Sequence, residues 1–141
     1  MTAEPVRFDT KIAVLLRDDL APWQELNVTS FLVSGVVATD AELIGEPYED
    51  ADGTRYLAML RQPVVVLAGD AAMLATAHSR ALSRKLETAV YISEMFATGH
   101  DTANRAAVRA VARDSLDLVG IAVIGPRNAV DRTFKGAALH R

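Results

Sequence analysis

Short apolar runs of strand length alternate along this chain with segments of helical periodicity, and that alternation constrains the fold more than any other feature. Three runs are apolar at nearly every position between their ends: Lys11–Arg17, Pro63–Ala68 and Leu118–Ile124. Continuous runs of this kind are typical of strands that are covered on both faces. The sequence therefore predicts an α/β domain, with a three-layer α/β/α architecture and a mixed, largely parallel central sheet.

The segments between these runs supply the helices and a hairpin. Apolar residues recur at three- and four-residue steps after Pro22, which suits the first turn of a helix. Asp70 and Asp101 are expected to cap a second and a third helix. Asp52-Gly53 lies between two short runs, as in a β-hairpin. The expected ranges are 23–38, 71–87, 102–113 and 127–132 for helices, 88–93 for a further strand and 43–60 for the hairpin.

Length and composition favour one ordinary globular domain. Half of the 141 residues are hydrophobic and no linker or repeat is visible, so we expect a single α/β domain over residues 1–141, with residues 1–10 as a loose leader. The formal net charge of −3 argues against a surface that follows nucleic-acid phosphates. The chain has no cysteine, no signal-like segment and no apolar run of membrane-spanning length, so the expected setting is the cytoplasm, without membrane contact.

Polar side chains interrupt the apolar faces of two predicted helices where strands are expected to end. Gln24 and Asn27 fall in line with Phe31, and Asn104 falls in line with Val108. Ligands of open α/β sheets bind at the carboxyl ends of strands, where helix N-termini point outward. One interpretation is therefore a small polar pocket. The other is that these amides pair with loop carbonyls and cap helix ends.

Three further residues complete the candidate pocket. Thr98 and His100 come from the loop before the third helix, and His100 is placed to act as a general base, unless it is simply solvated. Trp23 is a candidate wall of the pocket; alternatively it packs locally or anchors an interface. The three histidines lack the spacing of metal ligands on one helix face, so we expect neither a metal nor a cofactor.

Segments spread over nearly the whole chain carry a family resemblance. They are Arg17–Leu20, Trp23–Asn27 with Phe31-Leu32 and Gly35, Asp52-Gly53, Met95–Gly99 with Asn104, Leu118–Ile121, Gly125, Val130-Asp131 and Lys135-Gly136. On these residues the chain resembles the uncharacterised family known as domain of unknown function two thousand. The resemblance implies an α/β fold similar to that of the second, archaeal and eukaryotic type of peptidyl-tRNA hydrolase, together with the dimeric habit of that fold.

The catalytic residues of that hydrolase do not carry over to this chain. Val14–Leu20 and Gly125-Pro126 resemble it directly, but its lysine-rich turn before the first helix is replaced here by Ala21–Glu25, which contains no lysine. Its aspartate-alanine-glycine segment has no match, and Ala97–His100 stands in roughly that region. Lysine would contact tRNA phosphates, so the resemblance in fold does not imply the activity.

Three hypotheses for the function follow, and they leave open whether the protein is an enzyme. The first is a domain that binds or hydrolyses a small ligand at the strand ends, through Trp23, Gln24, Asn27, Thr98, His100 and Asn104. The second is a non-catalytic homodimeric interaction module. Peptidyl-tRNA hydrolase-like activity ranks last. A homodimer is expected in any case, because the apolar fraction is high for a small domain and two-fold pairs are the commonest oligomers.

Overall fold

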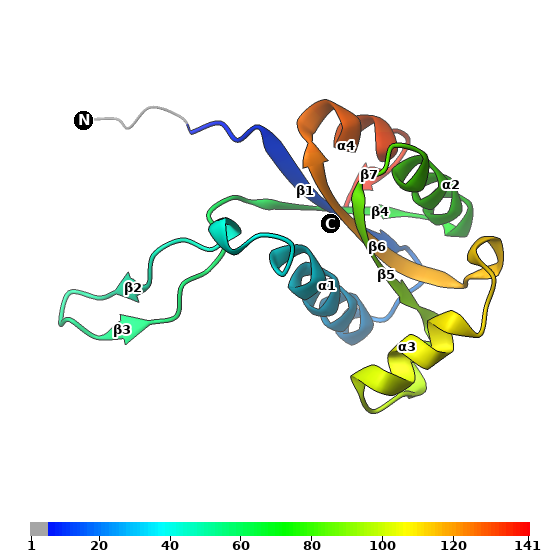
Figure 1. The fold of residues 1–141 in the computed structure, drawn as a ribbon, viewed down its shortest axis with the longest axis horizontal. Helices are drawn as coiled ribbons and strands as arrows, with labels where there is room; N and C mark the ends of the chain where they lie inside the picture. The colour runs from blue at the N-terminus through cyan, green and yellow to red at the C-terminus, as the bar shows by residue number, and fades with distance from the viewer. Residues whose placement is uncertain (1–5) are drawn as a thin grey trace.

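The structure is a computed structural model that describes residues 6–141, so the first half of the predicted leader lies outside the described residues. The described residues form a mixed α/β protein with a five-stranded sheet and four α-helices (Figure 1). The elements in chain order are β1 (Thr10–Arg17), α1 (Pro22–Val37), the 3-10 helix η1 (Ala41–Leu43), β2 (Tyr48–Glu49), β3 (Arg55–Tyr56), β4 (Val64–Gly69), α2 (Ala71–Ser83), β5 (Glu87–Ile92), the 3-10 helix η2 (Ser93–Ala97), α3 (Asp101–Arg109), the 3-10 helix η3 (Arg113–Ser115), β6 (Leu118–Pro126), α4 (Arg127–Thr133) and β7 (Ala138–Leu139).

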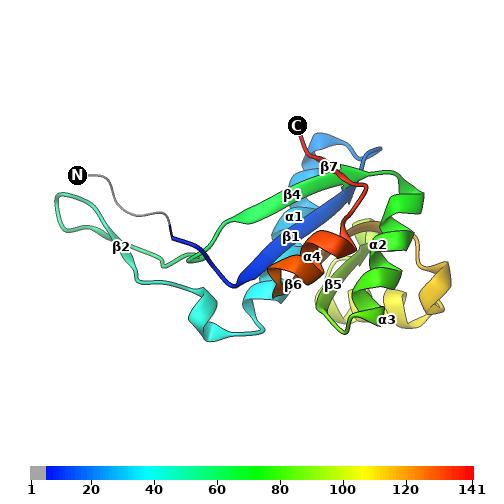
Figure 2. The ribbon, with the colours of Figure 1, turned by 90° about the horizontal axis from the view of Figure 1, so that it is seen from above.

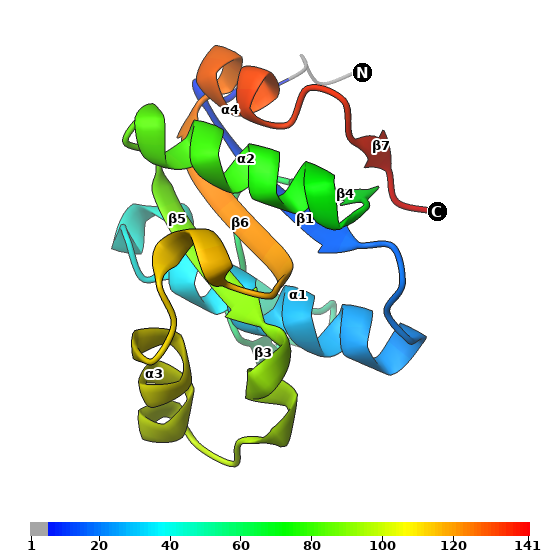
Figure 3. The same cartoon turned by 90° about the vertical axis from the view of Figure 1, so that its right-hand side faces the viewer.

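The central sheet has the strand order β5-β6-β1-β4-β7. β1 runs parallel to β4, whereas the β1–β6, β5–β6 and β4–β7 pairs are antiparallel. The prediction of a mixed sheet is therefore confirmed, but the prediction that it is largely parallel is wrong. The reason is that α3 lies beyond the end of β5 instead of crossing a face of the sheet (Figure 3), so the chain returns antiparallel as β6.

Helices cover both faces of the sheet, and alternate side chains of β1 serve the two sides. Ile12, Val14 and Leu16 are buried on the side of α1, whereas Ala13 and Leu15 are buried on the side of α2 and α4. Both clusters also take side chains from β6, whose residues 118–123 are all buried. The continuous apolar runs thus reflect burial on both faces of the sheet. A central strand is buried in this way whether it runs parallel or antiparallel to its neighbours.

Glycine at position 120 allows α1 to approach the sheet closely. A Cβ atom added to Gly120 on β6 would lie 2.6 Å from Cγ1 of Val28 and 3.0 Å from Cδ1 of Leu32, both on α1. These distances are shorter than a van der Waals contact between carbon atoms. The absence of a side chain at this position therefore sets how near α1, and the site that it carries, lies to the sheet.

Two helix boundaries differ from the sequence prediction. Asp70 caps α2 as predicted, since its carboxylate accepts the backbone N–H of Met73 at 2.8 Å. However, α2 ends at Ser83 and not near Glu87, because Lys85 adopts a left-handed conformation with a φ of 56° that stops the helix.

α3 also differs from its predicted boundaries. Asp101 is its first residue and not its cap; the cap is His100. The helix ends at Arg109 and not near Arg113, where the separate turn η3 begins.

The predicted hairpin is confirmed, but each of its strands is only two residues long. Tyr48 pairs with Tyr56, and the carboxylate of Asp50 closes the turn by accepting two backbone N–H groups and the Tyr56 hydroxyl. Residues 45–60 extend away from the sheet and its helices (Figures 1 and 2). This segment is referred to below as the arm.

The C-terminal residues are held against the start of α1. The backbone N–H of His140 donates to the carbonyl of Val66 at 3.0 Å, which continues the pairing of β7 with β4. The His140 Nε2 atom lies 2.7 Å from a carboxylate oxygen of Glu25 on α1. This contact ties the edge of the sheet to the helix that forms one wall of the candidate site.

Candidate functional site

Gln24, one of the six predicted site residues, belongs to the first turn of α1 and lies apart from the other five. Pro22 occupies the first helical position, where no backbone N–H is needed. The side-chain oxygen of Gln24 accepts the backbone N–H of Ala21 at 2.9 Å. Gln24 is therefore part of the helix start, as the capping interpretation predicted, and it does not line the cavity described next.

A cavity of about 410 Å³ lies between α1, η2 and the start of α3. It brings together five of the six residues that the sequence singled out: Trp23, Asn27, Thr98, His100 and Asn104. The remaining lining residues are Phe31, Tyr91, Met95, Phe96, Gly99 and Asp101. We refer to this space as the α1–α3 cavity.

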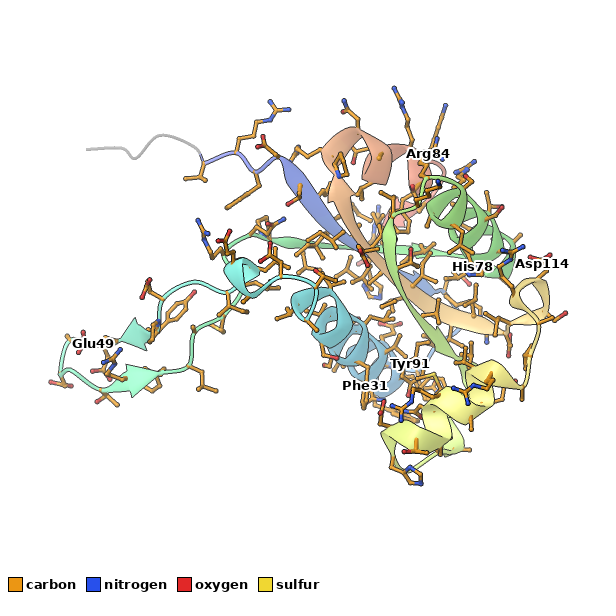
Figure 4. The ribbon with its side chains drawn as sticks, viewed as in Figure 1. Phe31, Glu49, His78, Arg84, Tyr91 and Asp114 are labelled. Atoms are coloured by element: carbon orange, nitrogen blue, oxygen red, sulfur yellow. The ribbon has the colours of Figure 1, made fainter. Side chains whose placement is uncertain are left out.

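Four aromatic side chains form the apolar part of the α1–α3 cavity. Trp23 meets Phe96 edge-on with ring centroids 5.7 Å apart, and the Phe96 centroid lies 5.1 Å from that of Tyr91. The centroids of Tyr91 and Phe31, which Figure 4 shows side by side, are 6.0 Å apart. Trp23 is 61% exposed and Phe31 is 51% exposed, so these rings leave faces open to a ligand. Phe31, Tyr91 and Phe96 were not predicted as site residues, because apolar side chains at core spacing indicate packing. Of the three, Phe31 carries a signal in the sequence, because it follows the predicted site residue Asn27 by one helical turn.

The side-chain amides of Asn27 and Asn104 in the α1–α3 cavity each use only one of their two polar atoms in a side-chain hydrogen bond. Asn27 Nδ2 donates to the Tyr91 hydroxyl at 3.3 Å. The Thr98 hydroxyl lies within hydrogen-bond distance of two acceptors, the carbonyl of Met95 at 2.9 Å and Asn104 Oδ1, and its one proton serves both. Within the described residues, no side-chain hydrogen bond uses Asn27 Oδ1 or Asn104 Nδ2. The cavity therefore offers one free amide acceptor and one free amide donor.

The ring of His100 is oriented by its role as the cap of α3. Its Nδ1 atom accepts the backbone N–H of Ala103 at 3.2 Å. In the neutral ring the proton must then sit on Nε2, which becomes a donor and not a base. His100 thus adds an aromatic face and a hydrogen-bond donor to the cavity wall.

Burial raises the pKa of the Tyr91 phenol, and the hydrogen bond from Asn27 opposes that shift. The hydroxyl therefore stays protonated well above neutral pH. At neutral pH Tyr91 can both accept from Asn27 and donate to a ligand, so it belongs to the polar as well as the aromatic part of the cavity.

A second cavity, of about 550 Å³, continues from the first along β5 and is referred to here as the β5 groove. The two spaces share Phe31, Tyr91, Met95, Asp101 and Asn104. The residues that belong to the β5 groove alone are Leu32, Ser34, Gly35, Ala89, Val90, Arg105, Val108 and Arg109.

The two arginines of the β5 groove differ in their partners. Arg105 forms an ion pair with Asp101. Among residues 6–141, no carboxylate lies within ion-pair distance of Arg109. The β5 groove therefore carries one uncompensated positive charge.

An ion cluster fixes the segment that carries η2. Arg17 at the end of β1 donates to Asp19 at 2.7 Å and to Asp117 at 2.8 Å, and its side chain is 16% exposed. The Ser93 hydroxyl donates to Asp117 at 2.5 Å. This bond, followed by the contact with Arg17, lowers the pKa of Asp117. The cluster joins β1, η2 and the start of β6, and so positions one wall of the α1–α3 cavity.

Residues 6–141 contain neither a candidate metal site nor a candidate membrane span. No three His, Asp or Glu side chains gather there in an arrangement that could hold a metal ion. No helix within the same residues is both long and apolar enough to cross a membrane.

Comparisons with known proteins place the chain in a family. A solved structure of a protein of unknown function from Agrobacterium tumefaciens is 52% identical, with a TM-score of 0.94, and the match covers 96% of this chain and 100% of that one. Among curated proteins no match was found. The model of a family described as protein of unknown function, DUF2000, matches residues 10–141. The chain therefore belongs to the DUF2000 family, as the sequence resemblance predicted.

Proposed function

We propose that the α1–α3 cavity binds a small, uncharged organic molecule that carries a flat apolar part and an amide-like group. The observation that supports this most is the pairing of one free amide acceptor, on Asn27, with one free amide donor, on Asn104, inside a cavity walled by aromatic rings. Concave sites with apolar walls and a few convergent polar groups are typical of small-molecule sites.

The two asparagines favour a ligand group that both donates and accepts hydrogen bonds. A primary amide can donate to Asn27 Oδ1 and accept from Asn104 Nδ2. The rings of Trp23 and Phe31 are half exposed or more, so a flat apolar ligand can cover them and gain hydrophobic and stacking free energy.

The hydrogen bonds of Thr98 and His100 favour binding over hydrolysis, because a hydrolase would need the first as a nucleophile and the second as a general base. The acceptors within reach of the Thr98 hydroxyl are the carbonyl of Met95 and Asn104 Oδ1, and no general base contacts this hydroxyl within the described residues. His100 Nδ1 accepts a backbone N–H, so the ring is not available as a base on that side. We therefore propose a binding role for the cavity.

Trp23 supplies the readout for a test, because it is the single tryptophan of the chain and lines the cavity. Titration with benzamide is expected to give a saturable change in tryptophan emission. Asn27→Ala and Asn104→Ala are each expected to weaken that binding roughly tenfold, since each removes one hydrogen bond to the ligand and leaves a ligand group unpaired.

Ser30→Ala is the matched control for these two variants. Ser30 is exposed on the same helix and its hydroxyl bonds only to the carbonyl of Leu26. Emission that never changes with benzamide, or a titration curve that is the same in both asparagine variants as in the control, would contradict the proposed site.

We also propose that the protein is a homodimer, and the arm is the observation that favours this second role. Tyr48, Tyr56, Leu57 and Met59 of the arm are all at least half exposed. Isolated two-stranded hairpins are marginally stable in water, and clustered exposed apolar side chains mark interaction surfaces. Sedimentation at micromolar concentration is expected to give a dimer; a monomer throughout that range would overturn this proposal.

A relation in fold to the second type of peptidyl-tRNA hydrolase, without its activity, is a further part of the proposal. Val14–Leu20 and Gly125-Pro126 support the relation, whereas the turn before α1 contains no lysine and the net charge is −3. We expect no release of tRNA from a peptidyl-tRNA, and tRNA binding that is weak and fades with added salt. Turnover of a peptidyl-tRNA would restore this activity as a candidate function.

We also propose a cytoplasmic setting, which the absence of cysteine from the chain supports.

A further inference from the structure

The arm carries a pattern of side chains that the rest of its own chain does not cover. Leu57 is 87% exposed and Met59 is 56% exposed, and the paired Tyr48 and Tyr56 are each about half exposed. The arm and α3 lie on opposite sides of α1 (Figure 1). α3 supplies Arg105, Val108 and Arg109 to the β5 groove. The arm of one molecule therefore points away from the β5 groove of the same molecule.

The charges of the arm and the β5 groove are opposite. The arm contains Glu46, Glu49, Asp50 and Asp52 against the single basic residue Arg55. The β5 groove contains Arg105 and Arg109 against Asp101, and the ion pair of Arg105 with Asp101 leaves Arg109 without a partner. Opposite charges of this kind steer two surfaces together and fix their register.

The backbone edges of the two elements are also complementary. β5 is the outermost strand of the central sheet, so one of its two edges pairs with no other strand in the described residues. Ala89, Val90 and Tyr91 of β5 line the groove on this side of the sheet. β2 and β3 form a separate two-stranded sheet, so each of them also has an unpaired edge. Unpaired edges bind further strands through their backbone hydrogen-bonding groups.

We infer that the arm of one copy docks in the β5 groove of a second copy, and that the exchange is mutual in a closed two-fold dimer. The inference rests on the proposed homodimer and names its contact. Arm tyrosines cover the apolar lining of the groove, and an arm carboxylate pairs with Arg109. The docked arm closes the open end of the β5 groove and leaves the α1–α3 cavity beside it for the small ligand, so the second copy completes the wall of that site.

The basic end of the molecule is the competing place for an acidic arm. Arg84, Lys85, Arg132 and Lys135 are exposed there, at the ends of α2 and α4, and Figure 4 shows Arg84 far from Phe31 and Tyr91. The groove is favoured because the arm presents aromatic and aliphatic side chains as well as charge, and the groove lining is largely apolar.

The absence of cysteine makes a direct test possible, because each introduced thiol is the only one in its chain. Leu57→Cys places a thiol on the arm, and Ser34→Cys places one on the wall of the β5 groove, where Ser34 is exposed. The two variants are mixed, allowed to exchange subunits and treated with a short bis-maleimide. The expected product is a covalent dimer of one chain of each kind. Arg84→Cys, at the basic end, replaces Ser34→Cys in the control mixture.

The outcomes separate the docking from the dimer itself. Efficient cross-linking of Leu57→Cys to Ser34→Cys and not to Arg84→Cys supports the docking. A dimer by sedimentation that cross-links preferentially to Arg84→Cys, or to neither, overturns the docking and leaves the dimer standing. A monomer by sedimentation overturns the dimer and the docking together.

A charge exchange provides an independent readout. Arg109→Glu is expected to weaken dimerisation roughly tenfold, because it places a carboxylate opposite the acidic arm. Combining it with Glu49→Arg is expected to recover most of the loss. A dimer that is unaffected by Arg109→Glu contradicts the proposed contact.

Discussion

Asn27 on α1 and Tyr91 on the edge strand β5 are joined by a hydrogen bond of 3.3 Å, with the amide Nδ2 donating to the phenolic oxygen. The bond joins two of the elements that enclose the α1–α3 cavity. It also satisfies a hydroxyl on a residue that is only 3% exposed. The same side chain, Asn27, therefore has a structural partner on one amide atom and a free atom for a ligand on the other.

Removing this hydrogen bond is expected to have a modest and non-additive effect on stability. Asn27→Ala and Tyr91→Phe should each lower the free energy of unfolding by about 0.5–1.5 kcal/mol, because each deletes the bond. The double variant should lose less than the sum of the two, since the second change has no bond left to remove. Urea denaturation of the four proteins measures the coupling. Strict additivity would show that the two side chains do not interact in solution.

Tyr91 should also make stability fall at alkaline pH. Burial raises its pKa above the ordinary tyrosine value of about 10, so the folded state favours the neutral phenol. That contribution is fully present below about pH 10 and is lost as the pH rises through the folded-state pKa. The stability advantage of the wild type over Tyr91→Phe should shrink through this range. Urea unfolding between pH 9 and pH 11 tests it, with absorbance at 295 nm reporting ionisation; an advantage that stays constant contradicts the expectation.

The sequence located the core strands well because burial on both faces leaves an unbroken apolar run. The run predicted from Lys11 matches β1, and the run predicted from Leu118 matches β6. The expectation of a largely parallel sheet is wrong because an apolar run records burial and not strand direction. Orientation depends on where α3 lies, which is settled by tertiary packing. The early end of α2 was missed because Lys85, and not glycine, takes the left-handed position.

The candidate site was predictable where a polar residue interrupts an apolar helix face. Asn27 and Asn104 were found in this way, and both line the α1–α3 cavity. The same rule misplaced Gln24, because a glutamine in the first helical turn can equally bond back to the preceding backbone, and here it does. Tyr91 and Phe96 could not be found, since only the folded chain brings a strand end and a 3-10 turn together with α1.

Gly120→Ala is expected to push α1 away from the sheet. The new methyl group would lie 2.6 Å from Cγ1 of Val28, so either the helix or the strand must move. Overpacking of this kind lowers the free energy of unfolding by about 1–3 kcal/mol. Gly99→Ala is the matched control, because a Cβ added there meets nothing within 4 Å. Thermal unfolding of both variants gives the comparison; equal melting temperatures would contradict the close approach of α1 to β6.

His78 on α2 should make the protein less stable in mild acid. Burial lowers its pKa, and the positive charge of Arg113 lowers it further. Because the folded-state pKa lies below the unfolded value of about 6.5, the unfolded state takes up the proton first and stability falls as the pH drops through this region. His78→Gln should flatten that part of the pH profile in urea unfolding. Arg113→Gln should raise the pKa of His78, measured by NMR titration of the imidazole; an unchanged pKa contradicts the role of Arg113.

His100 can be tested separately as a helix cap and as a wall of the cavity. Its Nδ1 atom accepts the backbone N–H of Ala103, so His100→Ala should lower the free energy of unfolding by about 0.5–2 kcal/mol. His100→Asn should recover most of this loss, because asparagine is a good cap, yet it also removes the imidazole ring from the cavity. If the ring contacts the ligand, benzamide binding measured by Trp23 emission weakens equally in both variants, although only the alanine variant is destabilised. Benzamide affinity that instead recovers with stability in His100→Asn would show that His100 acts on the site only by holding the start of α3.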